Sequence, residues 1–320
     1  MSDELQTVHK KKQPEPGAKE VYNMEYVLKT RDLTKKYGNK VVVNKLNMTI
    51  EKGDIYGFIG RNGAGKTTTM KMVLGMCFPN SGMIELFGRP AHNSARGRIG
   101  SLIEAPGIYK GYTAYENMKR FSILFGGDDK KINELLDMME LSGTGKKKAG
   151  AFSLGMKQRL GIAIAMLGDP EFLVLDEPVN GLDPAGIKGV RDVILRLNKE
   201  KGVTFFISSH LLGELAKIST RYGIINDGVL VEEFTAEELM ENCRKILTIK
   251  CSEPKKADEL LKTKLGIEDL SIKEDTITVN SGFDDPASIN SALVKAECGV
   301  FDFHVSNLEM EDYFIERIGR

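Results

Sequence analysis

Hydrophobic and polar residues alternate along the first patterned part of the chain, and a period of two is typical of β-strands. Segments 26–38 (YVLKTRDLTKKYG) and 41–54 (VVVNKLNMTIEKGD) both alternate, and a turn near Gly38 would join the two strands. Three later segments are short apolar runs without alternation, namely 55–60, 172–176 and 203–209. Runs of this kind predict strands that are buried on both faces of a sheet.

Helical spacing lies between these buried runs. Segment 66–74 places Met70, Val73 and Leu74 on one face, and Gly75 can end this helix. Segment 184–200 predicts a second helix, and the region from about 113 to 170 is largely helical in pattern. Because strands alternate with helices, we expect a mainly parallel sheet with its ligand beyond the carboxyl ends of the strands.

The last part of the chain has a different pattern, in the order strand, helix, strand, strand, helix, strand. Ser252 would cap its first helix and Gly266 would end it, while Asp285 would open the second helix. A capping box at Ser306-x-x-Glu309 predicts a final helix. The order is that of a ferredoxin-like split βαβ module, and we expect a small α+β domain here.

Composition and pattern divide the chain into three parts. Residues 1–26 form a polar tail, 27–235 hold the main α/β pattern, and 236–320 hold the smaller module. The 45 basic and 45 acidic residues cancel, which argues against binding nucleic acid through bulk charge. No segment approaches the roughly 18 to 20 apolar residues of a membrane span, and the start lacks the apolar core of a secretory signal. The four cysteines lack metal-site or disulfide spacing and predict reduced thiols.

A glycine-rich segment follows the apolar run 55–60. It has the form Gly60-x-x-x-x-Gly65-Lys66-Thr67 and precedes a helical pattern, which favours a P-loop over a turn without function. Glycines let successive N–H groups face a phosphate, and the helix N-terminus adds positive charge. We expect Lys66 to reach the β- and γ-phosphates and Thr67 to bind Mg²⁺. The residues assigned to the nucleotide are Gly60, Asn62, Gly63, Ala64, Gly65, Lys66, Thr67 and Thr68.

Two adjacent carboxylates, Asp176 and Glu177, stand at the end of the apolar run 172–176. Neighbouring residues on a strand point to opposite sides, so one carboxylate can hold a metal ion while the other faces a water molecule. We assign Asp176 to Mg²⁺ and Glu177 to the general base. Such a pair alone is more often a solvated turn, but its occurrence together with a P-loop favours the catalytic interpretation.

In this order the motifs resemble those of ATP-binding cassette subunits of ABC transporters, from residue 27 to about 235. FSLGMKQR at 152–159 resembles the signature motif, and NGLD at 180–183 resembles the D-loop. His210 resembles the switch histidine, and Tyr37 stands where the family places an aromatic ring that stacks on adenine. The resemblance implies an α/β P-loop NTPase of the ABC type, a mixed sheet with an antiparallel β subdomain and a helical subdomain at about 104–165.

The resemblance also implies a mechanism, in which two copies of the chain close head to tail on two ATP molecules. Ser153 and Gly155 would contact the γ-phosphate from the other copy. His210 would hold the attacking water together with the base, and Asp183 would couple the two sites. Donors aimed at developing charge are what phosphoryl transfer requires.

A separate multi-span membrane permease is the second partner that the resemblance implies, and it would hold this chain at the cytoplasmic face of the membrane. The family docks a cytoplasmic permease helix in a groove near residues 104–125. The segment 107–118 (GIYKGYTAYENM) has an aromatic composition that suits a partner surface, although plain packing explains it equally well.

Two departures from the family pattern concern the site. In the signature segment, Leu154 replaces a glycine and Met156 replaces a glutamine. Glu104 stands where the family has a glutamine that contacts Mg²⁺, so we expect Glu104 to be a metal ligand, with an inert loop carboxylate as the alternative. Together with LIEAPGIY at 102–109, this glutamate resembles the cassettes of bacitracin- and lantibiotic-type exporters, which protect bacteria against antimicrobial peptides.

Two other classes of function remain as alternatives. One is an ABC ATPase that acts on ribosomes or nucleic acid, but the single P-loop and the zero net charge argue against it. The other is a regulatory module that binds ATP without hydrolysis, and the presence of Glu177 and His210 argues against that.

Overall fold

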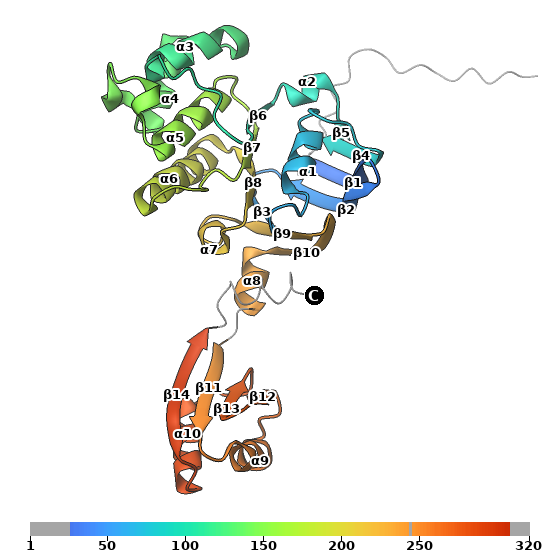
Figure 1. Cartoon of the computed structure of the whole chain (residues 1–320), viewed down its shortest axis with the longest axis vertical. Coiled ribbons are helices and arrows are strands. Elements are labelled where there is room, and N and C mark those ends of the chain that lie inside the picture. Colours follow the sequence, from blue (N-terminus) through green and yellow to red (C-terminus); the bar gives the residue numbers. More distant parts are fainter. Residues whose placement is uncertain (1–25, 243–244, 308–320) are drawn as a thin grey trace, which may run out of the picture.

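The computed structural model describes residues 26–242 and 245–307. Nearly all of the predicted polar tail, residues 1–25, therefore lies outside the described residues. Residues 26–242 contain an antiparallel sheet and a six-stranded sheet, and a third sheet forms in the last part of the chain. Figure 1 shows the third sheet beyond α8, apart from the other two.

The antiparallel sheet has the order β2-β1-β4-β5. The predicted hairpin is confirmed as β1 (Tyr26–Tyr37) and β2 (Lys40–Glu51), which pair antiparallel around the turn at Gly38. β4 (Ser81–Leu86) and the short β5 (Arg89–Pro90), which we did not predict, extend it. Alternate residues of β2 such as Leu46, Met48 and Ile50 are buried, because one face of the sheet packs on the core.

The six-stranded sheet has the order β10-β9-β3-β8-β7-β6. The predicted buried strands are confirmed as β3 (Ile55–Ile59), β7 (Phe172–Asp176) and β8 (Thr204–Ser209), in which every residue is buried. β6 (Ile99–Leu102), β9 (Arg221–Asn226) and β10 (Val229–Thr235) complete it. Five strands are parallel and β10 is antiparallel, which confirms the expected mainly parallel sheet.

Helices cover both faces of this sheet (Figure 1). α1 (Lys66–Val73) lies on the side of the antiparallel sheet, with the short α2 (Asn93–Arg96) beyond it. α3 (Ala114–Phe125), α4 (Asp129–Met138), α5 (Leu154–Ala165) and α6 (Pro184–Lys201) lie on the other side, with 3₁₀ turns at Ser142–Thr144 and Ala149–Ala151. α7 (Leu212–Leu215) and α8 (Ala236–Asn242) follow β8 and β10.

Each face of the sheet has its own hydrophobic core, and β7 contributes to both. Phe172 and Val174 pack with α1 and the antiparallel sheet, while Leu173 and Leu175 pack with the helical side. This alternation determines the side of the sheet on which the next residue, Asp176, emerges.

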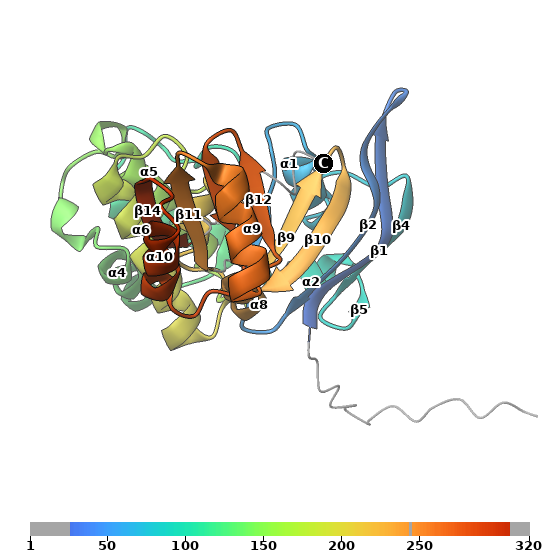
Figure 2. The same ribbon diagram turned by 90° about the horizontal axis from the view of Figure 1, so that it is seen from below.

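The third sheet confirms the predicted ferredoxin-like module. Its elements in chain order are β11 (Lys245–Cys251), α9 (Pro254–Leu265), β12 (Leu270–Lys273), β13 (Thr276–Val279), α10 (Pro286–Lys295) and β14 (Val300–Asn307). The strand order is β12-β13-β11-β14 and every pair is antiparallel, as in a split βαβ arrangement. Figure 2 shows α9 and α10 lying along this sheet, and their apolar residues share one core with β11 and β13.

Of the helix-cap predictions in this module, the one at Ser252 is wrong and the one at Ser306 concerns residues outside the described range. Ser252 does not cap α9, because its hydroxyl accepts a bond from the Gly299 N–H (3.1 Å) and Glu253 takes the cap position without a side-chain bond. Gly266 ends α9 at φ 67° and Asp285 caps α10, both as predicted. Ser306 lies in β14, and the helix predicted after it falls on residues outside the described range.

Within residues 26–242 and 245–307, none of the helices combines the length and the apolar character needed to cross a bilayer.

Candidate nucleotide-binding site

The P-loop connects the end of β3 to the start of α1. Gly63 and Gly65 have φ values of 86° and 111°, which L side chains rarely adopt. A Cβ on Gly65 would lie 2.6 Å from the Val42 carbonyl oxygen, and one on Gly60 would lie 2.4 Å from that of Ile225. Positions 60 and 65 of the loop therefore have no room for a side chain. Since no side chain caps α1, the first N–H groups of the helix remain available to an anion.

The Lys66 side chain is 5% exposed and folds back over this loop. Its amine donates a hydrogen bond to the Gly60 carbonyl oxygen (2.6 Å) and lies 3.2 Å from Glu177 Oε1. A buried ammonium group needs such partners. A phosphate in the loop would offer it a stronger acceptor than the carbonyl oxygen.

Asp176 is buried between two hydroxyl groups. Thr67 Oγ1 donates to its Oδ2 (2.8 Å), and Ser208 Oγ donates to its Oδ1 (2.6 Å). Asp176 is in phase with Phe172 and Val174, which face α1, so the pleat of β7 brings it to Thr67. A carboxylate beside a hydroxyl is a donor set that suits Mg²⁺ when phosphates supply further oxygens. The residues present therefore fit the ion.

Sequence reasoning missed Ser208. Its position follows from the parallel register in which β7 and β8 pair Asp176 with Ser208. The signal was the third buried run, 203–209, which ends in two serines, but only the pairing of β7 with β8 shows which serine faces the carboxylate.

Glu177 and His210 lie in contact, a pairing that the sequence analysis did not predict. His210 Nδ1 is 2.8 Å from Glu177 Oε2, and Glu177 donates its N–H to Ser208 Oγ (2.9 Å). β7 ends at Asp176, and Glu177 has φ 50°, so a left-handed turn and not the strand pleat separates the two carboxylates. Our strand-based argument for their opposite directions is wrong in this detail. Glu177 Oε1 is buried and faces the Lys66 amine (3.2 Å), so the two carboxylate oxygens of Glu177 lie against Lys66 and His210.

A pocket of about 370 Å³ lies above the P-loop. Tyr37, which is 52% exposed, lines this pocket together with the P-loop and Glu177. The predicted residues that line it are Tyr37, Asn62, Gly63, Gly65, Lys66, Thr67, Thr68 and Glu177. Lys40 and Val42 also line it and were missed by sequence reasoning, although the β1–β2 hairpin register pairs Lys40 with Tyr37.

Glu104 lies two residues past β6 at φ 63°, and its carboxylate contacts Lys71 of α1 (2.7 Å). The hydrogen bond from Lys71 lowers the pKa of Glu104, and the same bond raises the pKa of Lys71. In this structure Glu104 is therefore paired with a lysine, no hydrogen bond among the described residues joins it to Thr67 or Asp176, and its role as a metal ligand stays a prediction. Among the described residues, no three His, Cys, Asp or Glu side chains gather as a metal cluster.

The signature and D-loop residues lie outside the P-loop pocket. Ser153 caps α5 by accepting a bond from the Met156 N–H (3.2 Å), and Asp183 caps α6 by accepting one from the Gly186 N–H (3.1 Å). A Cβ on Gly155 would lie 3.1 Å from the Gly186 Cα, so the two helices approach closely at their first turns. Their N-termini thus form one surface, separate from the P-loop of the same chain.

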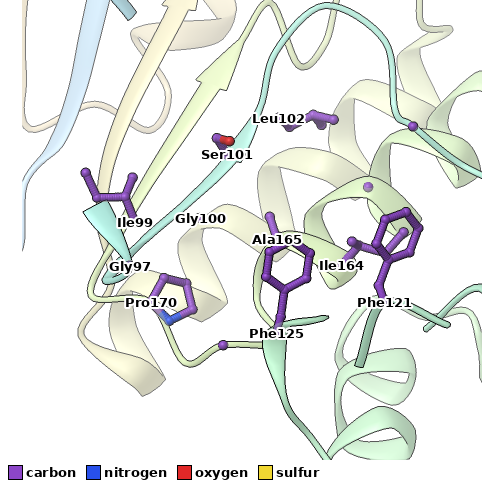
Figure 3. A pocket seen from close by; sticks show the side chains of 13 residues that line it. Gly97, Ile99, Gly100, Ser101, Leu102, Phe121, Phe125, Ile164, Ala165 and Pro170 are labelled. Carbon is purple, nitrogen blue, oxygen red and sulfur yellow. The ribbon is translucent and has the colours of Figure 1, made fainter. Parts of the chain in front are cut away.

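A second hollow, of about 250 Å³, lies between β6, α3 and α5 (Figure 3). Its lining is mostly apolar and includes Leu102, Phe121, Phe125 and Ile164. Ile123 and Leu124 on the exposed side of α3 are 83% and 74% exposed. This apolar groove begins at the strand that leads to Glu104.

Comparison with known proteins gives a consistent result. The family model described as "ABC transporter" matches residues 43–180. The chain is 44% identical over 301 residues to the bacitracin transport ATP-binding protein BcrA of Bacillus licheniformis, covering 92% of this chain and 98% of that protein. It is 42% identical over 217 residues to the lantibiotic transport ATP-binding protein SrtF of Streptococcus pyogenes, covering 67% and 94%.

Among solved structures, the chain resembles MJ0796, an ATP-binding cassette bound to ADP and Pi in a dimeric post-hydrolysis state. The TM-score is 0.58 at 22% identity, and the match covers 65% of this chain and 98% of that one. At this identity the likeness shows the fold alone.

Proposed function

Since this chain belongs to the ATP-binding subunits of ABC transporters, we propose that it hydrolyses ATP with Mg²⁺ to drive the export of peptide antibiotics through a separate membrane permease. The observation that carries the proposal is the joint placement of Lys66, Thr67, Asp176, Glu177 and His210 around one P-loop. The similarity to transport ATP-binding proteins favours this function over action on ribosomes or nucleic acid and over a regulatory module.

Each residue of the site has a defined task in this proposal. Lys66 leaves the Gly60 carbonyl and binds the terminal phosphates, while Thr67 and Asp176 hold the metal ion. Glu177 accepts the proton of the attacking water, and His210 fixes the direction of its carboxylate. When bound by Thr67 and Asp176, Mg²⁺ would supply positive charge beside the phosphoryl group. Tyr37 supplies an exposed ring for the adenine.

The site needs a second copy of the chain to be complete. Ser153, Gly155 and Asp183 lie on the joint α5–α6 surface and not in the P-loop pocket. In a head-to-tail dimer, this surface of one copy covers the nucleotide of the other. The dimeric state of MJ0796 is in keeping with such an arrangement.

The apolar groove between β6, α3 and α5 suits the permease. A cytoplasmic helix of the permease can place its apolar side on Phe121 and Phe125, and the exposed Ile123 and Leu124 extend this surface. We place the chain at the inner face of the membrane through this contact. BcrA is named for bacitracin and SrtF for a lantibiotic, and we propose the same class of substrate here.

Two variants test the ATPase. Lys66→Ala removes the phosphate contact, so we expect ATP binding and hydrolysis to be lost. Glu177→Gln keeps the shape but not the base, so we expect ATP to bind and hydrolysis to fall by about 100-fold or more. Binding is measured with a fluorescent ATP analogue and hydrolysis by phosphate release, with Glu171→Gln at the other end of β7 as control. Normal hydrolysis by Glu177→Gln would remove Glu177 as the base.

Transport is tested in sensitive bacteria that produce the chain together with its permease. We expect the pair to raise the concentration of bacitracin or of a lantibiotic that inhibits growth, and Lys66→Ala to abolish this protection. Protection that persists with Lys66→Ala, or its absence for both compounds, would contradict the proposed export.

A further inference from the structure

Three carboxylates gather at one edge of the six-stranded sheet. Asp176 and Glu177 stand at the end of β7, and Glu104 stands two residues beyond β6. β6 and β7 are neighbouring parallel strands, with Leu102 paired to Leu175. Glu104 and Glu177 therefore leave the sheet at the same level, beside the P-loop pocket.

Helix α1 supplies one counter-group for each of these carboxylates. Lys66 pairs with Glu177 (3.2 Å), Thr67 donates to Asp176 (2.8 Å) and Lys71 pairs with Glu104 (2.7 Å). Thr67 and Lys71 are four residues apart, so they lie on the same face of the helix. Lys71 thus occupies the turn of α1 that follows the phosphate-binding turn.

The Lys71–Glu104 pair is too exposed to matter much for folding. The two side chains are 34% and 67% exposed, and pairs of this kind add little to stability. The position of Lys71 is more telling, because it lies one turn of α1 beyond Thr67, which donates a hydrogen bond to Asp176 (2.8 Å). The lysine therefore stands within the field of the metal-binding carboxylate.

We propose that Lys71 is a positioning residue of the nucleotide site, which holds the Glu104 carboxylate against α1 and cancels its charge. A carboxylate beside the terminal phosphates would repel ATP, and a paired carboxylate repels it much less. Lys71 thereby allows this chain to carry glutamate at position 104. The inference rests on the proposed ATP site.

A double-mutant cycle that removes one or both charges tests this inference on the purified full-length chain. The variants are Lys71→Met, Glu104→Gln, the double variant and Lys71→Arg, and the readout is the Kd of a fluorescent ATP analogue with Mg²⁺. Lys71→Met should weaken binding about fivefold, the order of magnitude expected for one uncompensated charge in a partly hydrated site. Glu104→Gln, the double variant and Lys71→Arg should bind like wild type. At high salt the loss in Lys71→Met should shrink.

Lys119→Met is the matched control, because it breaks an ion pair with Asp129 on the helical side and should leave the Kd unchanged. The inference is overturned if Lys71→Met binds as tightly as wild type. It is also overturned if the double variant stays as weak as Lys71→Met, since Lys71 would then act on the phosphates directly or through the fold. Wild-type protein that binds no nucleotide would refute the proposed function itself, which is a distinguishable result.

Discussion

Ser208 shows how a single hydroxyl can organise both carboxylates of the site. It donates to Asp176 Oδ1 (2.6 Å) and accepts the N–H of Glu177 (2.9 Å), and its side chain is fully buried. The hydroxyl therefore fixes the metal ligand and the base relative to each other.

We expect Ser208→Ala to leave Asp176 with an unfilled acceptor and to lower the free energy of unfolding by about 1–3 kcal/mol. Hydrolysis should fall and should need more Mg²⁺, because Asp176 is held less firmly. Chemical denaturation and a Mg²⁺ titration of ATPase activity measure the two effects. Ser209→Ala is the control, since its hydroxyl contacts the Leu211 N–H (2.9 Å) and neither carboxylate. An unchanged Mg²⁺ requirement in Ser208→Ala would show that the hydroxyl does not position Asp176.

The sequence predicted those site residues that belong to local motifs. Lys66 and Thr67 follow a glycine pattern, and Asp176 and Glu177 follow an apolar run, so their chemistry is visible within a few positions. Ser208 and Lys71 acquire their roles from the neighbouring strand or loop, and sequence spacing carries no such information. Glu104 was expected as a metal ligand from its place in the family pattern, which stays a prediction, and its lysine partner 33 positions away could not be foreseen.

At the scale of elements, the contact between α5 and α6 determines where the signature surface lies. Gly155 of α5 faces Gly186 of α6, and a Cβ on Gly155 would lie 3.1 Å from the Gly186 Cα. The contact is between backbone atoms of the two helices, so a change of side-chain rotamer cannot relieve a clash there. Gly189, one turn further along α6, faces only the Arg159 side chain, at 3.7 Å.

Gly155→Ala should therefore push α5 and α6 apart and destabilise the protein by about 1–3 kcal/mol. Gly189→Ala should be neutral or stabilising by up to about 1 kcal/mol, because alanine favours the helix and space is available. Thermal unfolding of the two variants measures the difference. If both alanines stabilise equally, the close approach at Gly155 does not constrain the helices.

Element prediction followed the strength of the local pattern. β3, β7 and β8 are uniformly apolar, and α6 has a cap at Asp183 and an end at Gly202, so these elements were predicted closely. β6 has only four residues, and β10 is half exposed, so their patterns did not stand out. Ser252 was misassigned as a cap because its partner, Gly299, lies in a distant segment.

At the scale of the whole molecule, hydrophobic contacts divide the described residues into a cassette and a separate module. Residues of β11–β14, α9 and α10 form a core of their own, from Leu247 to Phe303. Leu239 of α8 instead belongs to the core on the helical side of the six-stranded sheet. We therefore propose a domain boundary between α8 and β11, slightly later than the expected position 236. The 217-residue match to SrtF spans 94% of that protein and 67% of this chain, so little of SrtF lies outside the matched segment.

A chain that ends at residue 242 should fold and should bind the fluorescent ATP analogue with the Kd of the full chain. The reason is that the P-loop pocket and both cassette cores draw on residues up to Leu239, while the sheet of the module pairs only within β11–β14. Its unfolding should be a single cooperative transition, and the full chain should show an additional one for the module. A chain that ends at residue 230 is the control, because it removes Phe234 and Leu239 from the cassette core and should unfold at a lower temperature. Loss of nucleotide binding in the 242-residue chain, with the fold intact, would mean that the module takes part in the ATP site.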